Sequence, residues 1–95
     1  MIIEQIKLER GTVLGLKFEM NKASLLVIKA QKGFVMCGYL NIEMAETIGD
    51  VAVLVRGVSN FDDVLNASAL EVTTEAGRLG IIKGMSGREC LNQMF

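Results

Sequence analysis

The chain has 95 residues, 51% of them hydrophobic, and its ten basic and eleven acidic side chains leave a net charge of −1 without any histidine. This balance argues against nucleic-acid binding, which needs clustered lysine and arginine. The lack of histidine excludes Ser-His-Asp and Cys-His catalysis within one chain. The length predicts a single domain that spans residues 1–95.

The apolar content exceeds what a domain of this size is expected to bury. We therefore expect apolar surface to face a partner, and association with further copies of the same chain explains it best. The longest unbroken apolar run, residues 51–55, is far too short to span a membrane, and the first residues lack the order of a signal peptide. These features predict a cytoplasmic homo-oligomer that does not enter a membrane.

The first 40 residues are patterned as strands joined by short turns. Leu14, Leu16, Phe18 and Met20 alternate with glycine and charged residues, a period of two that predicts a half-buried strand. Short connections between neighbouring strands predict an antiparallel meander. The expected strands are residues 2–9, 14–20, 24–31 and 34–38.

After Gly38 the pattern changes to alternating helices and strands. Asn41 is typical of a helix N-cap, and Gly49 of the residue that ends a helix. Ser86 and Glu89 form the Ser-x-x-Glu capping box at the start of a last helix, residues 87–94. Further helices are expected after residues 59–60 and 73–74, and strands at 51–55 and 69–73.

These elements predict an α+β fold: one mixed sheet of about six strands with three to four short helices. The two strand-helix-strand passages, residues 34–55 and 51–73, should be right-handed crossovers if the strands that they join are parallel neighbours.

The first candidate site is Cys37 with Gly38, at the expected end of a strand and just before a helix. Strand ends that lead into helices are common ligand sites in α/β sheets, and a helix N-terminus favours the thiolate form of a nearby cysteine. Gly38 would let a ligand approach the backbone closely. The alternative is that Cys37 is a small buried hydrophobic residue.

The second candidate site is the segment Gly84-Met85-Ser86-Gly87-Arg88. Backbone N–H groups at a helix start can hold an anion, and the Arg88 guanidinium can add further donors. Gly84, Ser86, Gly87 and Arg88 are therefore candidate ligand-binding residues. The alternative is that Ser86 only caps the helix, Gly87 permits close packing and Arg88 pairs with a carboxylate. The two cysteines form no CxxC motif, and the sequence predicts no metal and no cofactor.

Several segments of the chain occur together in one known family: residues 32–40 (KGFVMCGYL), 57–58 (GV), 64–67 (VLNA), 72–73 (VT), 79–81 (LGI) and 84–89 (GMSGRE). In their order and spacing, residues 24–94 resemble the YunC-like family of small bacterial and archaeal proteins of unknown function. Phe34 and Cys90 stand where the family more often has Tyr and Ala, which weakens any role for Cys90. The resemblance implies a compact, self-associating α and β domain and brings no established activity.

The leading hypothesis is a homo-oligomeric binding or assembly module that holds a small anionic ligand near residues 84–88. The alternative is a thiol-dependent enzyme with Cys37 as nucleophile, in which Arg88 and backbone N–H groups stabilise negative charge. This alternative lacks an evident general base, because histidine is absent.

Overall fold

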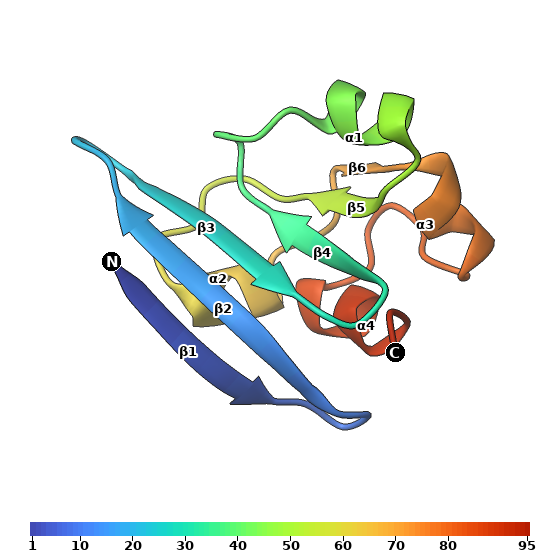
Figure 1. The fold of residues 1–95 in the computed structure, drawn as a ribbon, viewed down its shortest axis with the longest axis horizontal. Coiled ribbons are helices and arrows are strands. Elements are labelled where there is room, and N and C mark those ends of the chain that lie inside the picture. Colours follow the sequence, from blue (N-terminus) through green and yellow to red (C-terminus); the bar gives the residue numbers. More distant parts are fainter.

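Six strands form one sheet in the order in which they occur along the chain, as Figure 1 shows. The structure, a computed structural model, describes residues 1–95. Strands β4 and β5 are parallel, and all other neighbouring strands are antiparallel. The elements are β1 (Ile2–Lys7), β2 (Thr12–Glu19), β3 (Ser24–Lys29), β4 (Gly33–Met36), α1 (Ile42–Ile48), β5 (Val51–Leu54), α2 (Phe61–Asn66), β6 (Glu71–Val72), α3 (Thr74–Arg78) and α4 (Gly87–Asn92).

The α+β architecture predicted from the sequence is confirmed: a mixed sheet of six strands with four short helices. The caps explain why the helices begin and end where they do. The Asn41 side chain accepts hydrogen bonds from the first turn of α1, and Gly49 ends that helix with a φ of 83°. Ser86 and Glu89 form both hydrogen bonds of the capping box of α4.

The second passage, residues 51–73, does not meet the condition for a crossover, because β6 is antiparallel to β5. The chain leaves α2 and joins the sheet again at the carboxyl end of β5, where the Leu70 N–H donates to the Leu54 carbonyl. It then runs back along β5, and Thr73 N–H donates to the Ala52 carbonyl. The pairing lasts for only two residues, which is shorter than the strand expected at residues 69–73.

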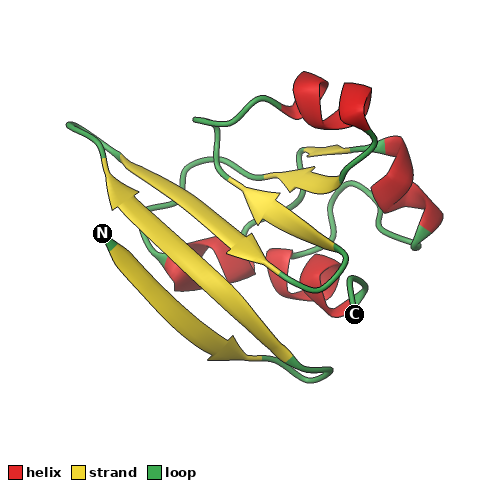
Figure 2. Ribbon diagram, viewed as in Figure 1, coloured by secondary structure: helices red, strands yellow, loops and turns green.

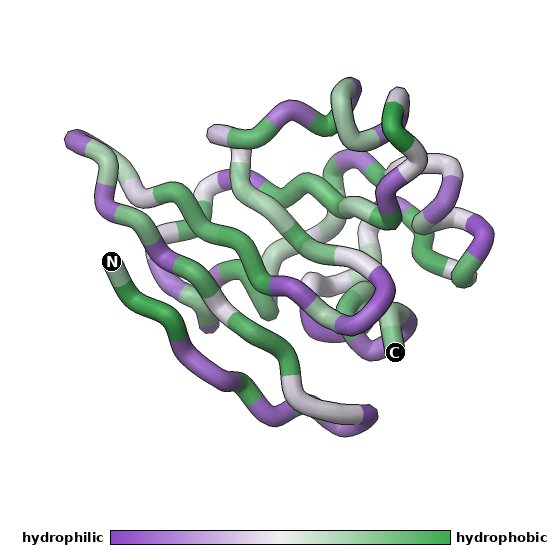
Figure 3. Tube along the Cα trace, viewed as in Figure 1, coloured by the Kyte–Doolittle hydropathy of each residue, from purple (hydrophilic) through white to green (hydrophobic).

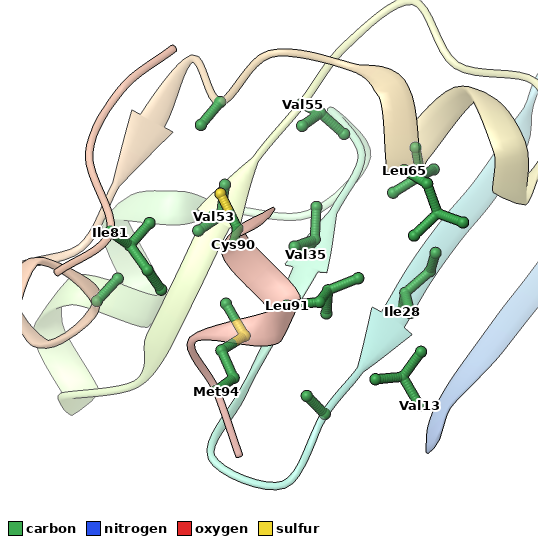
Figure 4. Close-up of a cluster of buried hydrophobic side chains, with 14 of the residues drawn as sticks. Val13, Ile28, Val35, Val53, Val55, Leu65, Ile81, Cys90, Leu91 and Met94 are labelled. Atoms are coloured by element: carbon green, nitrogen blue, oxygen red, sulfur yellow. The ribbon is translucent and has the colours of Figure 1, made fainter. Parts of the chain in front are cut away.

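The hydrophobic core lies on the face of the sheet that α2 and α4 cover. Figure 4 shows Leu91 of α4 beside Val35 and Ile28 of the sheet, with Met94 in the same buried cluster. The opposite face of β4 and β5 is covered by α1, where Met36 and Ala45 are buried. The sheet therefore has two covered regions on opposite faces. None of the helices has the length and apolar character that crossing a membrane requires.

Strands β1 to β3 carry no helix on the α1 side of the sheet (Figures 1 and 2). Leu14 and Phe18 are 45% and 47% exposed there, and Ile3 of β1 is 59% exposed. The alternation in β2 is thus confirmed, but its apolar side is the exposed one. The buried side holds Gly15, on which the Phe61 ring of α2 packs.

We call this exposed apolar surface the open face. The register places its members beside one another, since Leu16 lies between Ile3 on β1 and Val27 on β3. Hydrophobic residues recur along β2 and β3 in Figure 3. The open face consists of the exposed Ile3, Leu14 and Phe18 together with the half-buried Leu16 and Val27.

Candidate functional site

The candidate site is a cleft where the chain leaves the two parallel strands. Strands β4 and β5 end on the same side of the sheet, next to the turn between β2 and β3 (Figure 1). Ligands of sheets with parallel strands commonly bind in the crevice at the carboxyl ends of those strands. The cleft has a volume of about 420 Å³. It is lined by Ala23, Ser24, Cys37, Gly38, Tyr39, Arg56, Gly57 and Val58.

Cys37 reaches the cleft, but its thiol is engaged by the backbone of β3. The residue is 4% exposed, and its Sγ accepts a hydrogen bond from the Leu26 N–H at 3.2 Å. The thiol also faces the Ser24 carbonyl at 3.9 Å. No carboxylate lines the cleft, so the structure offers the thiol no acidic or basic partner there apart from Arg56. The thiol therefore continues the pairing of β3 with β4 by one residue.

Arg56 is the charged residue of the cleft. It is exposed and forms no salt bridge, unlike Arg78, Arg88 and Lys83. Its stem lies across the end of β4, because a Cβ added at Gly38 would be 3.6 Å from the Arg56 Nε. The Arg56 side chain thus lies over the end of β4, beside the cleft.

A second cleft, of about 380 Å³, shares Arg56, Gly57 and Val58 with the first and continues toward α2. Asp63 lines this second cleft, and its carboxylate accepts the Ser59 N–H at 2.9 Å. No three histidine, cysteine, aspartate or glutamate side chains come together anywhere as a metal site.

The segment 84–88 forms a tightly paired helix start. Gly84 N–H donates to the Ala69 carbonyl, and Gly87 N–H donates to the Ala67 carbonyl. Ser86 N–H donates to the Glu89 carboxylate, which lowers the pKa of that carboxyl. Among the backbone N–H groups of residues 84–88, only that of Arg88 has no acceptor in the protein.

Gly87 and Arg88 have structural contacts of their own. A Cβ at Gly87 would collide with the Val64 carbonyl oxygen, so the glycine lets α4 approach α2. Arg88 Nη1 donates to the Glu9 carboxylate at 3.3 Å, and Asn92 Nδ2 donates to the same carboxylate at 2.7 Å. The Asn92 hydrogen bond is the main cause of the lowered pKa of Glu9, and the charge of Arg88 adds to it. These contacts attach the β1–β2 turn to α4.

The two sites predicted from the sequence do not meet. Cys37 and Gly38 lie near the β2–β3 turn, whereas Arg88 contacts Glu9 near the β1–β2 turn. Strand β2 separates these turns with eight residues, or about 25 Å of extended chain. Arg56, which does lie in the cleft with Gly38, was missed by the reasoning from sequence. The sequence does contain one indication of this position: Arg56 directly follows the apolar run 51–55, where a buried strand is expected to end.

Cys90 lies in the core and away from the cleft. It is fully buried, and burial raises the pKa of its thiol to about 11, with a smaller contribution from the charge of Glu89. A thiol with this pKa is almost entirely protonated at neutral pH, so Cys90 is a packing residue.

Comparison with known proteins identifies the family. A family model described as a domain of unknown function, DUF1805, matches residues 36–94, which include the cleft residues 37–39 and 56–58 and all of α4. The chain belongs to the DUF1805 family. Its sequence is 37% identical over 78 residues to the uncharacterized protein YunC of Bacillus subtilis (strain 168), covering 78% of this chain and 77% of YunC. The YunC-like resemblance noted in the sequence is thereby confirmed.

A solved structure extends the similarity to the whole domain. The protein of unknown function TA1206 from Thermoplasma acidophilum matches with a TM-score of 0.94 and 37% sequence identity. The match covers 99% of this chain and 92% of TA1206. The N-terminal strands β1 to β3 thus belong to the part of the fold that the two proteins share.

Proposed function

We propose that this member of the DUF1805 family is a homo-oligomeric binding module whose copies associate through the open face. The observation that carries the proposal is the exposure of Ile3, Leu14 and Phe18 on a sheet surface that no helix covers. Large contiguous apolar patches are rare on monomers and usually mark interaction sites. A cytoplasmic location is part of the proposal, and two free, buried cysteines suit a reducing compartment.

A second copy of the same chain is the occupant that the open face fits best. Its members are uncharged, and the register adds two cations to its border, Lys29 opposite Leu14 and Lys7 opposite Thr12. A two-fold axis would therefore bring apolar side chains against apolar side chains with little repulsion.

The cleft at the carboxyl ends of β4 and β5 is the ligand site of this module. It supports the proposal because it combines apolar lining with a cation that forms no salt bridge, Arg56. The start of α4 is the less favoured place for the ligand. Its backbone donors are engaged except for that of Arg88, and the Arg88 side chain is paired with Glu9.

Native mass spectrometry tests the assembly. We expect a multiple of the chain mass for the wild type and a monomer for Phe18→Lys, because a buried unpaired charge would oppose association. Ile82→Lys is the matched control, since Ile82 is 64% exposed and lies outside the open face. A wild type that is monomeric at micromolar concentration would reject the assembly, as would an oligomer unchanged by Phe18→Lys.

A thiol-dependent enzyme is the second candidate function, and it rests on the position of Cys37 in the lining of the cleft. If Cys37 is a nucleophile, its thiol should react with iodoacetamide at neutral pH far faster than that of Cys90. Mass spectrometry of labelled peptides separates the two cysteines. Equal and slow labelling would reject the enzyme and leave Cys37 with the structural role that its contact with Leu26 indicates.

A further inference from the structure

We propose that the cleft binds the oxyanion group, phosphate or carboxylate, of a small molecule, with Arg56 and the backbone N–H groups of its two loops as donors. This inference deepens the proposed function and rests on its ligand-binding part. It names the chemistry of the ligand and the residues that recognise it. It also moves the anion from the start of α4 to the ends of β4 and β5.

The first observation is the side chain of Arg56. A guanidinium offers five donors in a planar fork that matches phosphate and carboxylate groups. Arg56 has no carboxylate within 4 Å and donates no hydrogen bond to the protein, so all five donors are free. Its stem lies against Gly38, and the residue lines the cleft.

The second observation is the set of backbone donors around the cleft. The N–H groups of Gly38, Tyr39, Arg56, Gly57 and Val58 have no acceptor in the protein. Neighbouring residues are paired: Cys37 N–H donates to Leu26, and Val55 N–H donates to Met36. Around the cleft, the free donors therefore lie on its two loops, residues 38–39 and 56–58.

The third observation is the conformation of the second loop. Gly57 has a φ of 72°, in the left-handed region, and it directly follows Arg56. Successive N–H groups around such a residue form concavities that bind anions. Nothing lies within 4 Å of a Cβ placed at Gly57, so the glycine is there for its backbone conformation and not for packing.

The charges around the cleft favour an anion over a cation. Arg56 is the only charged residue in its lining. Asp63, in the first turn of α2, lines the second cleft, and its carboxylate accepts the Ser59 N–H. An anion in the first cleft would thus meet a free guanidinium without facing a carboxylate.

The size and lining limit the rest of the molecule. A volume of about 420 Å³ accommodates a compact organic molecule, and one arginine is too few for a polyanion such as nucleic acid. Tyr39, the single tyrosine of the chain, is 50% exposed and lines the cleft together with Val58 and Ala23. These side chains suit an apolar or planar body attached to the oxyanion group.

Titration with phenyl phosphate, benzoate and uncharged phenol, followed by ¹H–¹⁵N NMR at constant ionic strength, tests the proposal. We expect at least one of the two anions to shift the amide signals of Gly38, Gly57 and Val58 saturably, and phenol to leave them unchanged. Arg56→Gln should weaken that binding by about tenfold or more, because charge-assisted hydrogen bonds are the strong ones. Arg78→Gln is the matched control, since Arg78 is exposed and paired with Glu75; its unchanged affinity supports the proposal.

Each other outcome overturns the proposal in a recognisable way. Shifts at residues 84–88 that Arg88→Gln abolishes would return the anion to the start of α4. Phenol binding as tightly as the anions, unaffected by Arg56→Gln, would keep a ligand cleft but remove the oxyanion. If no probe gives saturable shifts, the cleft is not an anion site. The assembly is tested independently, by native mass spectrometry.

Discussion

For two glycines in helices, the local packing decides whether an added side chain would destabilise the fold. Gly87 lies where α4 meets α2, and a side chain there would collide with the Val64 carbonyl. Gly77, in α3, has nothing within 4 Å of an added Cβ and does not have a positive φ. The same substitution should therefore have opposite effects at the two positions.

We expect Gly87→Ala to destabilise the fold by about 1–3 kcal/mol, because the two helices must separate to accommodate the methyl group. Gly77→Ala should stabilise it by roughly 0.5–1 kcal/mol, through the lower entropy of the unfolded chain. Urea denaturation of both variants measures the free energy of unfolding. A neutral Gly87→Ala would mean that the close approach of α4 to α2 is not required.

Cys90 makes stability depend on pH in the alkaline range. Its folded-state pKa is raised from 9.0 to about 11, so the unfolded chain loses the thiol proton first. Stability should therefore fall as the pH rises from about 9 to about 11, by roughly 2–3 kcal/mol. Cys90→Ala should remove this part of the loss. The measurement is the free energy of unfolding across that range for both proteins, and parallel curves would contradict the burial of the thiol.

At the residue scale, the position of the candidate cleft was partly predictable from the sequence, but its charged residue was not. Cys37 and Gly38 were predicted at a strand end, and they do line the cleft. Arg56 was not recognised, because it is one of ten scattered basic residues in the sequence. Its place in the cleft arises from the parallel pairing of β4 with β5, which brings residues 38 and 56 together.

At the element scale, Thr73 joins α3 to β5 and to the residue before β5 through one hydroxyl group. It is 2% exposed, and its Oγ1 accepts from the N–H groups of Ala52 and Ala76 and donates to the Asp50 carbonyl at 2.7 Å. The hydroxyl thereby holds the start of α3 against β5.

We expect Thr73→Val to cost about 1–3 kcal/mol, because the isosteric methyl group leaves buried backbone groups without partners. Thr74→Val is the control. Thr74 is exposed and its hydroxyl makes no hydrogen bond, so its loss should change stability by about 0.5 kcal/mol or less. Thermal unfolding of the two variants compares them directly, and equal effects would rule out the proposed role of the hydroxyl.

The helix ends were predictable from sequence because their causes are local. Asn41 caps α1, Gly49 ends it, and the Ser86–Glu89 box starts α4, all within a few residues of sequence. The extent and direction of β6 were not predictable, since they depend on where α2 returns the chain to the sheet. A strand of two residues is defined by its partner and not by its own pattern.

At the scale of the whole molecule, self-association through the open face should couple stability to protein concentration. The midpoint of thermal unfolding should rise with wild-type concentration, because only the folded chain can associate. In Phe18→Lys the midpoint should not depend on concentration. Differential scanning calorimetry over a hundredfold range of concentration measures both, and a wild-type midpoint independent of concentration would contradict the assembly.

The sequence by itself determined the strand and helix periods, the caps and the apolar content, because each depends on neighbours in the chain or on composition. Only the tertiary structure decided which side of β2 is buried. Gly15 faces α2 because the Phe61 ring fills the space that a side chain would need, and this leaves Leu14 and Phe18 exposed. Likewise, only the parallel pairing of β4 with β5 placed Arg56 beside Gly38, since a cleft between loops exists only once distant segments have packed together.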